Sequence, residues 1–390
     1  MKVYFSVIGI GLGHMTRCLA IAERLKRNGV ECVFSSYGHA SDIASSLGYS
    51  TYRSIPMSWF QDENGVVDFE STFLKTPIFF KKMSRHFRDE IHRIRLESPD
   101  MVISDSRYTS IPASKDTKVP RLYITNQPRI LMPREDDGTS KTTSPLEMMG
   151  CWVNYRLLSG QDRILIPDFP LPYSISKRHM MFHDAPSKFI DKAQFIGPIS
   201  VQRPRREISG NVDAVCEKYG VKPGNYIYIA FSGPGTIDKR ITDAINAFFK
   251  NHHLPGIMGT GKSGKTRINR EGDMILVDGW IEDRAELMEG AKFVITRGGL
   301  STISEVVAFG KPSIVIPQGN QPEQESNAMG VEDLGIGLKL EPREMDLLPE
   351  KVEQLLNSEH MFMSALKWKR VAAKWKGEEK AERMIMELLG

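Results

Sequence analysis

The sequence predicts an α/β protein of two domains, each built on a doubly wound sheet of mostly parallel strands. The chain has 390 residues, which is more than one hydrophobic core usually serves. Short apolar runs alternate with amphipathic stretches, as strand–helix–strand units require. Prolines and arginines interrupt this alternation at 195–207, after which it resumes. We therefore expect a linker there, a domain boundary near residue 200, and two halves that face each other across a cleft.

The first half should form a parallel sheet from buried apolar runs. After the first strand, Ala20, Ile21 and Leu25 have the spacing of a helix's buried face. The pair Asn28-Gly29 is typical of a helix end. The strands are expected at 3–9, 31–36, 101–104, 121–125 and 163–167.

The second half repeats this pattern without repeating the sequence. A helix is expected near 237–250, and the charged end of the chain from about Glu359 to Gly390 has a helical pattern. The strands are expected at 225–233, 274–279, 293–299 and 312–317. Both halves therefore predict Rossmann-like domains.

Composition excludes several classes of function. The apolar fraction of 41% and the charged fraction of 26% are ordinary for a soluble globular protein. The four cysteines are scattered without a C-x-x-C pair, which argues against a metal site or disulfide framework and fits a reducing, cytoplasmic compartment. The net charge of +4 permits an anionic ligand or membrane surface. Met1-Lys2 leads directly into a strand and long apolar runs do not occur, so we expect no signal peptide and no membrane span.

The Gly-rich stretch GIGLGHMTR at 9–17 follows the first expected strand, where phosphate-binding loops occur. It departs from the dinucleotide fingerprint G-x-G-x-x-G, because His14 occupies the third glycine position. A dinucleotide site also needs an acid at the end of the second strand. The only acid of that strand, Glu31, stands at its start. The sequence therefore disfavours an NAD site.

His14 stands where a side chain could act on a ligand at the end of a strand. Imidazole is a common general base near neutral pH. Asp105 directly follows the expected strand at 101–104, and a carboxylate there could hold the imidazole's tautomer and stabilise the imidazolium. Base and orienting acid would together activate a hydroxyl. The alternatives are that His14 caps its helix and Asp105 caps the segment after it.

Two overlapping P-loop patterns occur at 256–263 and 259–266. A true P-loop opens a helix whose N-terminal amides hold the phosphates. The residues after Lys265 contain one apolar residue and a glycine turn before the next strand, so no amphipathic helix fits. We therefore interpret these patterns as a basic, Gly-rich surface loop.

The stretch TRGGLSTISE at 296–305 is the stronger phosphate signal. Glycines there permit close backbone approach, and Ser301 and Thr302 open a helix whose N-terminus favours a phosphate. Arg297 adds a bidentate cation. Glu305 lies one turn further on the same helix face, where a carboxylate can accept both ribose hydroxyls.

Three more stretches complete a nucleotide-sugar site. Trp280 follows a strand and offers a flat face for a base. Glu323 and Gln324 follow another strand and place an acceptor beside a donor for sugar hydroxyls. Ser232 and Gly233, in FSGPGT, are available to a diphosphate.

These residues resemble the GT-B glycosyltransferases, in particular the family 28 branch that includes the MurG-type N-acetylglucosaminyltransferases. GWIED, RGGLSTISE and PEQESNA occur in the family order, and GLGHMTR resembles its segment with the acceptor-activating His. Arg297 stands where the related UDP-glycosyltransferases have His, and Asp283 where they have Gln. The resemblance implies donor-binding roles for Ser232, Gly233, Trp280, Arg297, Gly299, Ser301, Thr302, Glu305, Glu323 and Gln324; catalytic roles for His14 and Asp105; and an acceptor-side loop with Gly11, Gly13 and Arg17.

The resemblance also implies the organisation and the reaction. We expect an acceptor-binding domain at 1–200, a nucleotide-sugar-binding domain at 201–365, and a C-terminal helix at 366–390 that packs back on the first. The expected activity is an inverting glycosyltransferase that uses a UDP-sugar or another nucleotide sugar as co-substrate, without a tightly bound cofactor or metal. The alternatives are a UDP-sugar 2-epimerase, a non-catalytic nucleotide-sugar-binding subunit and a P-loop NTPase. No nucleic-acid partner is expected.

The segment at 73–95 is basic and partly apolar. From Lys75 to Arg95 it holds seven Lys or Arg against two acids. Phe80, Met83, Phe87, Ile91 and Ile94 have helical spacing and are expected to face the core. MurG-like enzymes act on lipid-linked acceptors, and this segment falls where their membrane patch lies. We therefore expect a peripheral contact with an anionic membrane, at the inner face of the cell membrane, although a solvated basic helix would give the same pattern.

Overall fold

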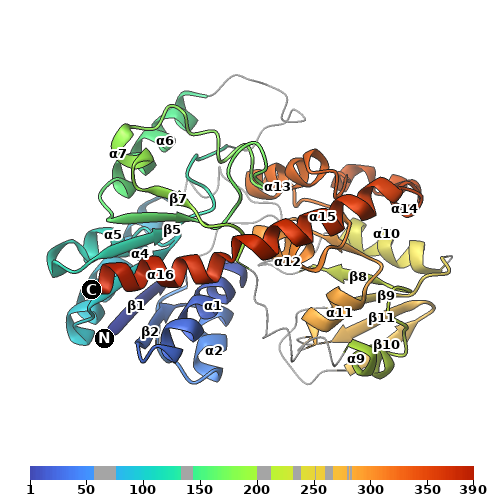
Figure 1. Ribbon diagram of the computed structural model, residues 1–390, viewed down its shortest axis with the longest axis horizontal. Coiled ribbons are helices and arrows are strands. Elements are labelled where there is room, and N and C mark those ends of the chain that lie inside the picture. Colours follow the sequence, from blue (N-terminus) through green and yellow to red (C-terminus); the bar gives the residue numbers. More distant parts are fainter. Residues whose placement is uncertain are drawn as a thin grey trace. The chain divides into compact units, whose positions relative to one another are not determined.

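The computed structural model describes residues 1–56, 76–132, 144–199, 212–231, 239–250, 252–259, 267–278, 281 and 283–390. These residues form two compact units. The first unit holds the described residues before Ser200 together with Trp375–Gly390, and the second holds those from Val212 to Lys374. Each unit is built on a seven-stranded sheet (Figure 1). The predicted α/β class with two Rossmann-like sheets is confirmed.

All described strand pairs of the first sheet are parallel, in the order β3-β2-β1-β4-β5-β6-β7. Each strand that the sequence predicts is present, and β3 and β7 are additional edge strands. The strands are β1 Lys2–Val7, β2 Glu31–Ser36, β3 Ser50–Arg53, β4 Met101–Asp105, β5 Arg121–Ile124, β6 Arg163–Ile166 and β7 Ala193–Phe195. The α-helices are α1 Gly13–Arg27, α2 His39–Ser46, α4 Thr76–Glu97, α5 Ser110–Ala113, α6 Pro145–Leu158, α7 Ser187–Ile190 and α16 Gly377–Leu389, and η1 Lys115–Thr117 is a short 3-10 helix.

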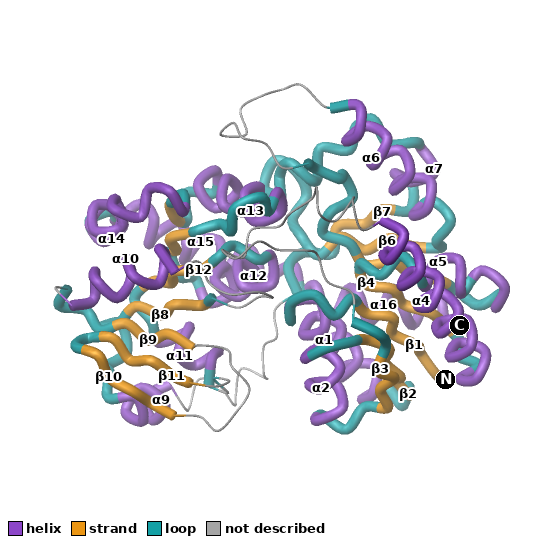
Figure 2. The backbone as a smooth tube through the Cα atoms, turned by 180° about the vertical axis from the view of Figure 1, so that it is seen from behind, coloured by secondary structure: helices purple, strands orange, loops and turns teal. Residues whose placement is uncertain are grey.

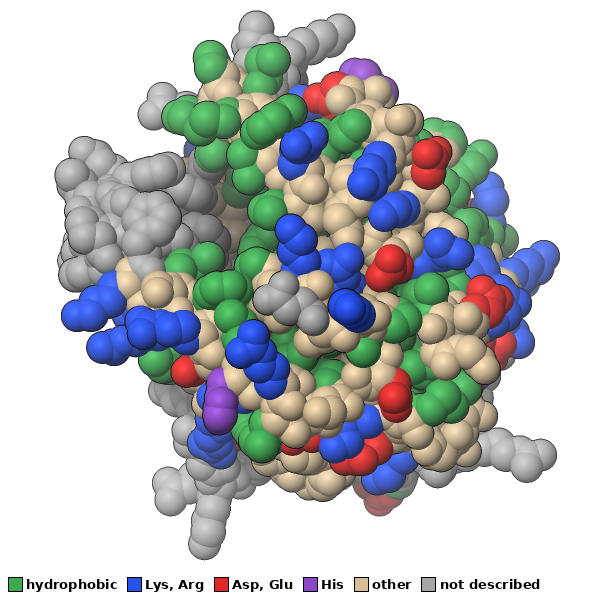
Figure 3. All heavy atoms as spheres, turned by 90° about the vertical axis from the view of Figure 1, so that its left-hand side faces the viewer, with side chains coloured by type: hydrophobic (Ala, Val, Ile, Leu, Met, Phe, Trp, Pro, Cys, Tyr) green, Lys and Arg blue, Asp and Glu red, His purple; other side chains and the backbone are tan. Residues whose placement is uncertain are grey.

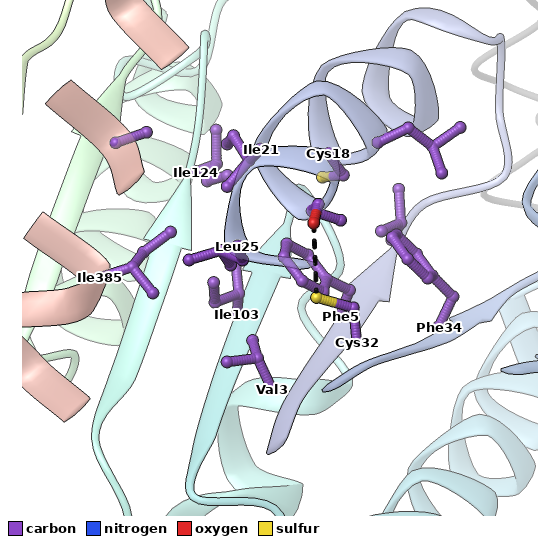
Figure 4. Close-up of a cluster of buried hydrophobic side chains, with 14 of the residues drawn as sticks. Val3, Phe5, Cys18, Ile21, Leu25, Cys32, Phe34, Ile103, Ile124 and Ile385 are labelled. Carbon is purple, nitrogen blue, oxygen red and sulfur yellow. Dashed lines mark hydrogen bonds between the residues drawn. The ribbon is translucent and has the colours of Figure 1, made fainter. Parts of the chain in front are cut away.

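Successive residues of each strand point to opposite faces of the sheet, and helices cover both faces. Figure 2 shows this arrangement of helices and strands from behind. Val3 and Phe5 of β1 belong to a core shared with α1 and α16, in which Ile385 lies beside Leu25 and Ile124 (Figure 4). The alternate strand residues point to the opposite face, where α4 and α6 pack. Helix α1 ends at Arg27 with Asn28 as its C-cap, where the sequence predicts the end.

The expected domain boundary near residue 200 coincides with the end of the N-terminal part of the first unit, but two other expected limits differ from the structure. Ile196 and Ile199 are buried in the core of the first unit, so the start of the expected linker at 195–207 is structural. The chain returns to this unit at Trp375, later than the expected residue 366. The reason is that α15 continues to Trp375 and the backbone turns only at Lys376, which has a positive φ. Gly377 then passes so close to Pro198 that a Cβ would lie 2.6 Å from its carbonyl oxygen.

The second sheet has the order β10-β11-β9-β8-β12-β13-β14. Its edge strand β10 pairs antiparallel with β11, a hairpin that the sequence pattern does not predict. The strands are β8 Ile227–Ala230, β9 Gly256–Gly259, β10 Arg267–Glu271, β11 Met274–Asp278, β12 Phe293–Thr296, β13 Ser313–Val315 and β14 Gly337–Lys339. The helices are α9 Val212–Tyr219, α10 Lys239–Lys250, α11 Arg284–Gly290, α12 Leu300–Phe309, α13 Pro322–Asp333, the 3-10 helix η2 Pro342–Leu347, α14 Leu348–Leu356 and α15 Glu359–Trp375.

The P-loop patterns fall on a strand and on residues outside the described ones. Gly256–Gly259 is β9, which corrects the expectation of a loop throughout this stretch. Lys262 and Lys265 lie outside the described residues. The next described residue, Arg267, begins β10. A strand therefore stands where a P-loop would continue as a helix.

Helix α4 covers a buried polar cluster rather than a purely apolar core. Glu90 and Arg107 pair at 2.9 Å, and both side chains are almost completely inaccessible. Glu90 also accepts hydrogen bonds from Ser6 at 2.8 Å and Ser35 at 2.5 Å. Arg107 donates to Ser35 and to Ser54. This network links β1, β2 and the residue after β3 to α4 and to the residues that follow β4.

The expected inward face of α4 was therefore only partly right. Ile94 is buried, and Phe87 and Ile91 are partly buried against the core beneath the helix. The side chains that are buried as completely as Ile94 are His86 and Glu90. Glu90 is one of the two acids in the basic segment predicted from the sequence. Its carboxylate is buried in the ion pair with Arg107 and does not contribute to the surface charge.

Burial of His86 gives the fold a defined acid sensitivity. Burial and the charge of Arg107 lower the pKa of His86 to about 4. An unfolded histidine titrates at about 6.5, so the unfolded chain binds this proton first as the pH falls. The stability that His86 contributes is therefore complete above about pH 6.5 and is lost towards about pH 4, by about 3 kcal/mol.

We expect His86→Gln to remove this part of the pH dependence. Urea denaturation of the first unit across that pH range should give a flatter profile of unfolding free energy for the variant than for wild type. His92→Gln, at an exposed position of the same helix, should keep the wild-type slope. Equal slopes for all three proteins would contradict the buried, neutral state of His86.

Candidate functional site

The Gly-rich stretch places the start of α1 at the carboxyl end of β1. A Cβ on Gly9 would lie 2.3 Å from the carbonyl oxygen of Tyr37, so only glycine fits there. Gly11 has a φ of 75°, which also favours glycine. Gly13 is the first residue of α1, and His14 follows it in the first turn. The glycines thus let the chain turn tightly enough to set His14 at this edge of the sheet.

The structure brings His14 and Asp105 together. His14 Nδ1 lies 2.7 Å from Asp105 Oδ1. The Asp105 side chain is fully buried as the last residue of β4, whereas the His14 side chain is 19% exposed. A carboxylate can only accept at this distance, so the Asp105 contact places the proton on Nδ1; Arg17 Nη2, which can only donate, then lies 2.9 Å from Nδ1 without donating to it. That leaves the lone pair on Nε2.

Arg17 is a third member of this cluster. The sequence places it on an acceptor-side loop, but it lies within α1 and is buried. Its Nε and Nη2 each donate to Asp105 at 2.5 Å, and Nη2 lies 2.9 Å from His14 Nδ1. Cys18 Sγ also donates to Asp105, at 3.3 Å. Spacing explains the arrangement, because His14 and Arg17 are three residues apart on one helix face.

The charge of Arg17 fixes the protonation of Asp105. Burial alone would raise the pKa of the Asp105 carboxyl, but Arg17 and then His14 hold it well below its usual range. Asp105 therefore stays ionised throughout the range in which imidazole titrates. The dyad expected from the sequence is structurally a triad, in which Asp105 and Arg17 form a neutral pair beside His14.

The second unit presents a helix N-terminus after β12. Arg297 is buried, and Gly298 has a positive φ with a Cβ position only 2.7 Å from Val315. Gly299 is the N-cap of α12, so the half-buried Ser301 and Thr302 lie in the first turn. Free backbone N–H groups and the helix dipole favour an anion at such an end.

Glu305 lies in the middle of α12 and pairs with Arg284, at the start of α11. The Glu305 side chain is 6% exposed and that of Arg284 is 24% exposed. Arg284 is not predicted from the sequence, because nothing in its spacing links it to Glu305. Asp283, which stands where the resembled enzymes have Gln, pairs instead with Lys218 at 2.5 Å. Its carboxylate therefore contacts α9.

Helix α13 forms a hydrogen bond with the loop between β12 and α12. Asn327 Nδ2 donates to the carbonyl of Gly298 at 2.8 Å. Gln324 Oε1 accepts from the backbone N–H of Gln318 at 2.7 Å, which leaves the amide nitrogen of Gln324 as its donor. Glu323 lies in the first turn of α13. Ser232, Gly233 and Trp280 lie outside the described residues.

The described residues offer neither a metal cluster nor a membrane span. Among them, no group of three or more His, Cys, Asp or Glu side chains could hold a metal ion. No described helix combines the length and the apolarity needed to cross a membrane. The four cysteines are buried free thiols.

The buried ion pair of Asp105 and Arg17 generates a stability prediction. Arg17→Met would leave a buried carboxylate without its cation, a change that costs about 3–5 kcal/mol. Urea denaturation of the full-length protein measures this loss of unfolding free energy. The control is Arg24→Met on the same helix, which removes a partly exposed pair with Glu382 and should cost at most about 1 kcal/mol. Similar small losses for both variants would contradict the structural role of Arg17.

Comparison with known proteins agrees with these two halves. Residues 238–385 match the glycosyltransferase family 28 C-terminal domain. An uncharacterized glycosyltransferase of Methanosarcina acetivorans is 29% identical over 350 residues, which cover 87% of this chain and 84% of that protein. The UDP-N-acetylglucosamine–N-acetylmuramyl-(pentapeptide) pyrophosphoryl-undecaprenol N-acetylglucosamine transferase of Clostridioides difficile is 25% identical over 370 residues, which cover 90% of this chain and 79% of that protein.

The solved structures agree on the fold. The crystal structure of LpCGTa in complex with UDP matches with a TM-score of 0.68 and 15% identity over 99% of both chains. The resemblance drawn from the sequence motifs is thereby confirmed. With its two Rossmann-like sheets and these relatives, the chain is a glycosyltransferase of the GT-B fold, and its residues 238–385 match the family 28 C-terminal domain.

Proposed function

We propose that the protein transfers a sugar from a UDP-sugar to an acceptor hydroxyl with inversion at the anomeric carbon. The observation that carries this proposal is the cluster of His14, Asp105 and Arg17. A neutral imidazole with its Nδ1 proton held by a carboxylate is the form that accepts a proton at Nε2. The UDP bound by the structural neighbour and the UDP-sugar in the name of the Clostridioides difficile relative support the choice of donor.

The transfer exchanges one bond for another. His14 Nε2 takes the proton of the acceptor hydroxyl, and that oxygen forms the new bond to the anomeric carbon. The bond from this carbon to the diphosphate breaks on the opposite face, and UDP leaves with the electron pair. The imidazolium formed on His14 faces the ionised Asp105, whose protonation Arg17 prevents.

The leaving diphosphate needs stabilisation where its charge develops. The N-terminus of α12, with Ser301 and Thr302 in its first turn, supplies N–H groups and a favourable dipole. Arg297 adds the cation of this loop. Glu305 would accept the ribose hydroxyls, Trp280 would stack on the base, and Glu323 with Gln324 would bind the donor sugar. No tightly bound cofactor or metal is required by this chemistry.

The acceptor is proposed to be lipid-linked. The Clostridioides difficile relative is named for a pyrophosphoryl-undecaprenol acceptor. In this chain, α4 turns a row of basic side chains outward, in support of a peripheral contact through residues 73–95. Within that segment, the structure describes side chains only from Lys81. The exposed row consists of Lys81, Arg85, Arg88, His92 and Arg95.

We expect His14→Ala to reduce transfer by about 10²- to 10⁴-fold, because a general base is lost. UDP binding, measured by calorimetry, should stay at the wild-type value, since the base acts on the acceptor. Turnover is measured as UDP release from a panel of UDP-hexoses. His39→Ala, an exposed histidine on α2, is the matched control and should keep full activity. Retention of more than about a tenth of wild-type turnover in His14→Ala would refute the base assignment.

The same assay separates the alternatives. An epimerase would convert the UDP-sugar without an acceptor and without UDP release. A non-catalytic subunit would bind UDP but leave every donor unchanged. Transfer predicts acceptor-dependent UDP release.

Glu305→Ala should weaken UDP binding by about 1.5–3 kcal/mol, because a charge-assisted hydrogen-bonding partner is removed. Lys262→Ala and Lys265→Ala should leave UDP affinity unchanged, since the proposed donor site does not use them. Calorimetry with UDP and with ATP measures both effects. Tight ATP binding that either lysine substitution abolishes would support a P-loop NTPase instead.

A further inference from the structure

Helix α6 exposes an unusually apolar face. Six of its large apolar side chains are between 39% and 63% exposed. Monomeric soluble proteins rarely expose contiguous apolar surface of this kind, and where they do it commonly marks an interaction site. The six residues, called here the α6 face, are Leu146, Met148, Met149, Trp152, Val153 and Leu157.

The α6 face is continuous around half of the helix. At about 100° per residue, the six residues and Arg156 occupy one contiguous arc of roughly 180°. The opposite arc packs against the sheet and α7 through Cys151, Tyr155 and Leu158. Helix α6 is therefore apolar on both sides, so that one half forms core and the other half has no described partner within the first unit.

The charges of α6 are arranged unequally. The only acid in the helix, Glu147, is buried and lies 3.6 Å from Arg129. The only base, Arg156, is exposed within the apolar arc, with its guanidinium 5.7 Å from the Trp152 ring centre. The outward side of the helix thus combines apolar side chains, an aromatic ring and a positive charge, without an acid.

The α6 face and the basic row of α4 lie on the same side of the first sheet. Val102 of β4 packs beneath α4, and Tyr123 of β5 packs beneath α6. Val102 and Ser104 point to the same face of β4, and Ser104 pairs with Tyr123 in the register of the sheet. Both helices therefore belong to one outer layer. Figure 3 shows one face of the molecule, on which Lys and Arg side chains are spread over the middle and apolar side chains gather toward the top.

We propose that this layer docks on an anionic lipid bilayer, with the α6 face inserted among the acyl chains and the α4 row above it at the head groups. Amphipathic helices that lie in the interface combine Trp and Leu with neighbouring cations in this way. A protein partner would bring hydrogen-bonding groups at regular intervals, but the side-chain N–H donors on this side of α6 are limited to the Trp152 indole and the neighbouring Arg156 guanidinium. Lipid chains require no such partners.

This docking rests on the peripheral membrane contact of the proposed function and divides it between two helices. The α6 face inserts into the bilayer, whereas the basic row of α4 contributes only electrostatic attraction to the head groups. The two contributions have different salt dependence. Attraction between exposed charges is screened by salt, whereas burial of apolar side chains is not. Binding to vesicles can therefore be divided between the two helices.

The experiment is flotation of the full-length protein with vesicles of phosphatidylcholine alone or mixed with phosphatidylglycerol. Wild type should bind the anionic vesicles, and added salt should weaken that binding. Met149→Ser with Trp152→Ser should lower binding about tenfold or more at low and high salt alike. Arg85→Glu with Arg88→Glu should lower it chiefly at low salt. The matched control is Met363→Ser with Leu366→Ser, which removes two exposed apolar side chains of α15, and it should bind like wild type.

Three results would overturn the inference. These are failure of wild type to bind either vesicle, equal loss in the α6 and α15 variants, and a dimer in light scattering that the α6 substitutions dissolve. UDP calorimetry and UDP release with a soluble acceptor are measured on the same variants. Unchanged values there, together with unchanged vesicle binding, would reject the α6 face while leaving the proposed transferase intact. Loss of turnover in His14→Ala tests the proposed transferase and not the docking of the α6 face.

Discussion

The first unit depends on one buried carboxylate. Asp105 ends the β4 strand at the centre of the sheet and receives hydrogen bonds from three residues of α1, namely His14, Arg17 and Cys18. It therefore fixes the position of the helix relative to the sheet and the tautomer of the imidazole at the same time. A buried carboxylate is tolerable only because Arg17 neutralises it. The residues of the candidate catalytic cluster therefore also stabilise the fold of the first unit.

Sequence patterns located most of the strands, the course of α1 and the pairing of His14 with Asp105. These succeed because apolar periodicity and strand ends are local signals. They failed where a charge is buried by a distant partner. Arg17 and Glu90 look like surface residues in sequence, and only Asp105 and Arg107 from other elements make their burial possible. The edge strand β10 was missed for a similar reason, since its five residues include three charges.

In the second unit, the candidate site at the N-terminus of α12 is positioned by a glycine turn and by contacts from two neighbouring helices. The backbone after β12 must turn through Gly298, and Asn327 then binds the carbonyl of that glycine. Arg284 and Glu305 hold α11 against α12. The N-terminus of α12, the proposed site of the diphosphate, is therefore held by contacts from α13 and α11, and such preorganisation suits electrostatic stabilisation of a leaving group. Sequence motifs identified this loop but could not show which side chains brace it.

The position of α16 has a consequence for biosynthesis. Ala381 and Ile385 complete the core against which α1 packs, yet they follow the whole second unit in the chain. The described residues of the second unit from Val212 to Lys374 are therefore synthesised while the first unit still exposes the apolar side of its sheet and of α1. The nascent chain must keep that surface from aggregating until α16 emerges. The second unit is in effect an insertion, and the first can be made alone only by joining its two separate pieces.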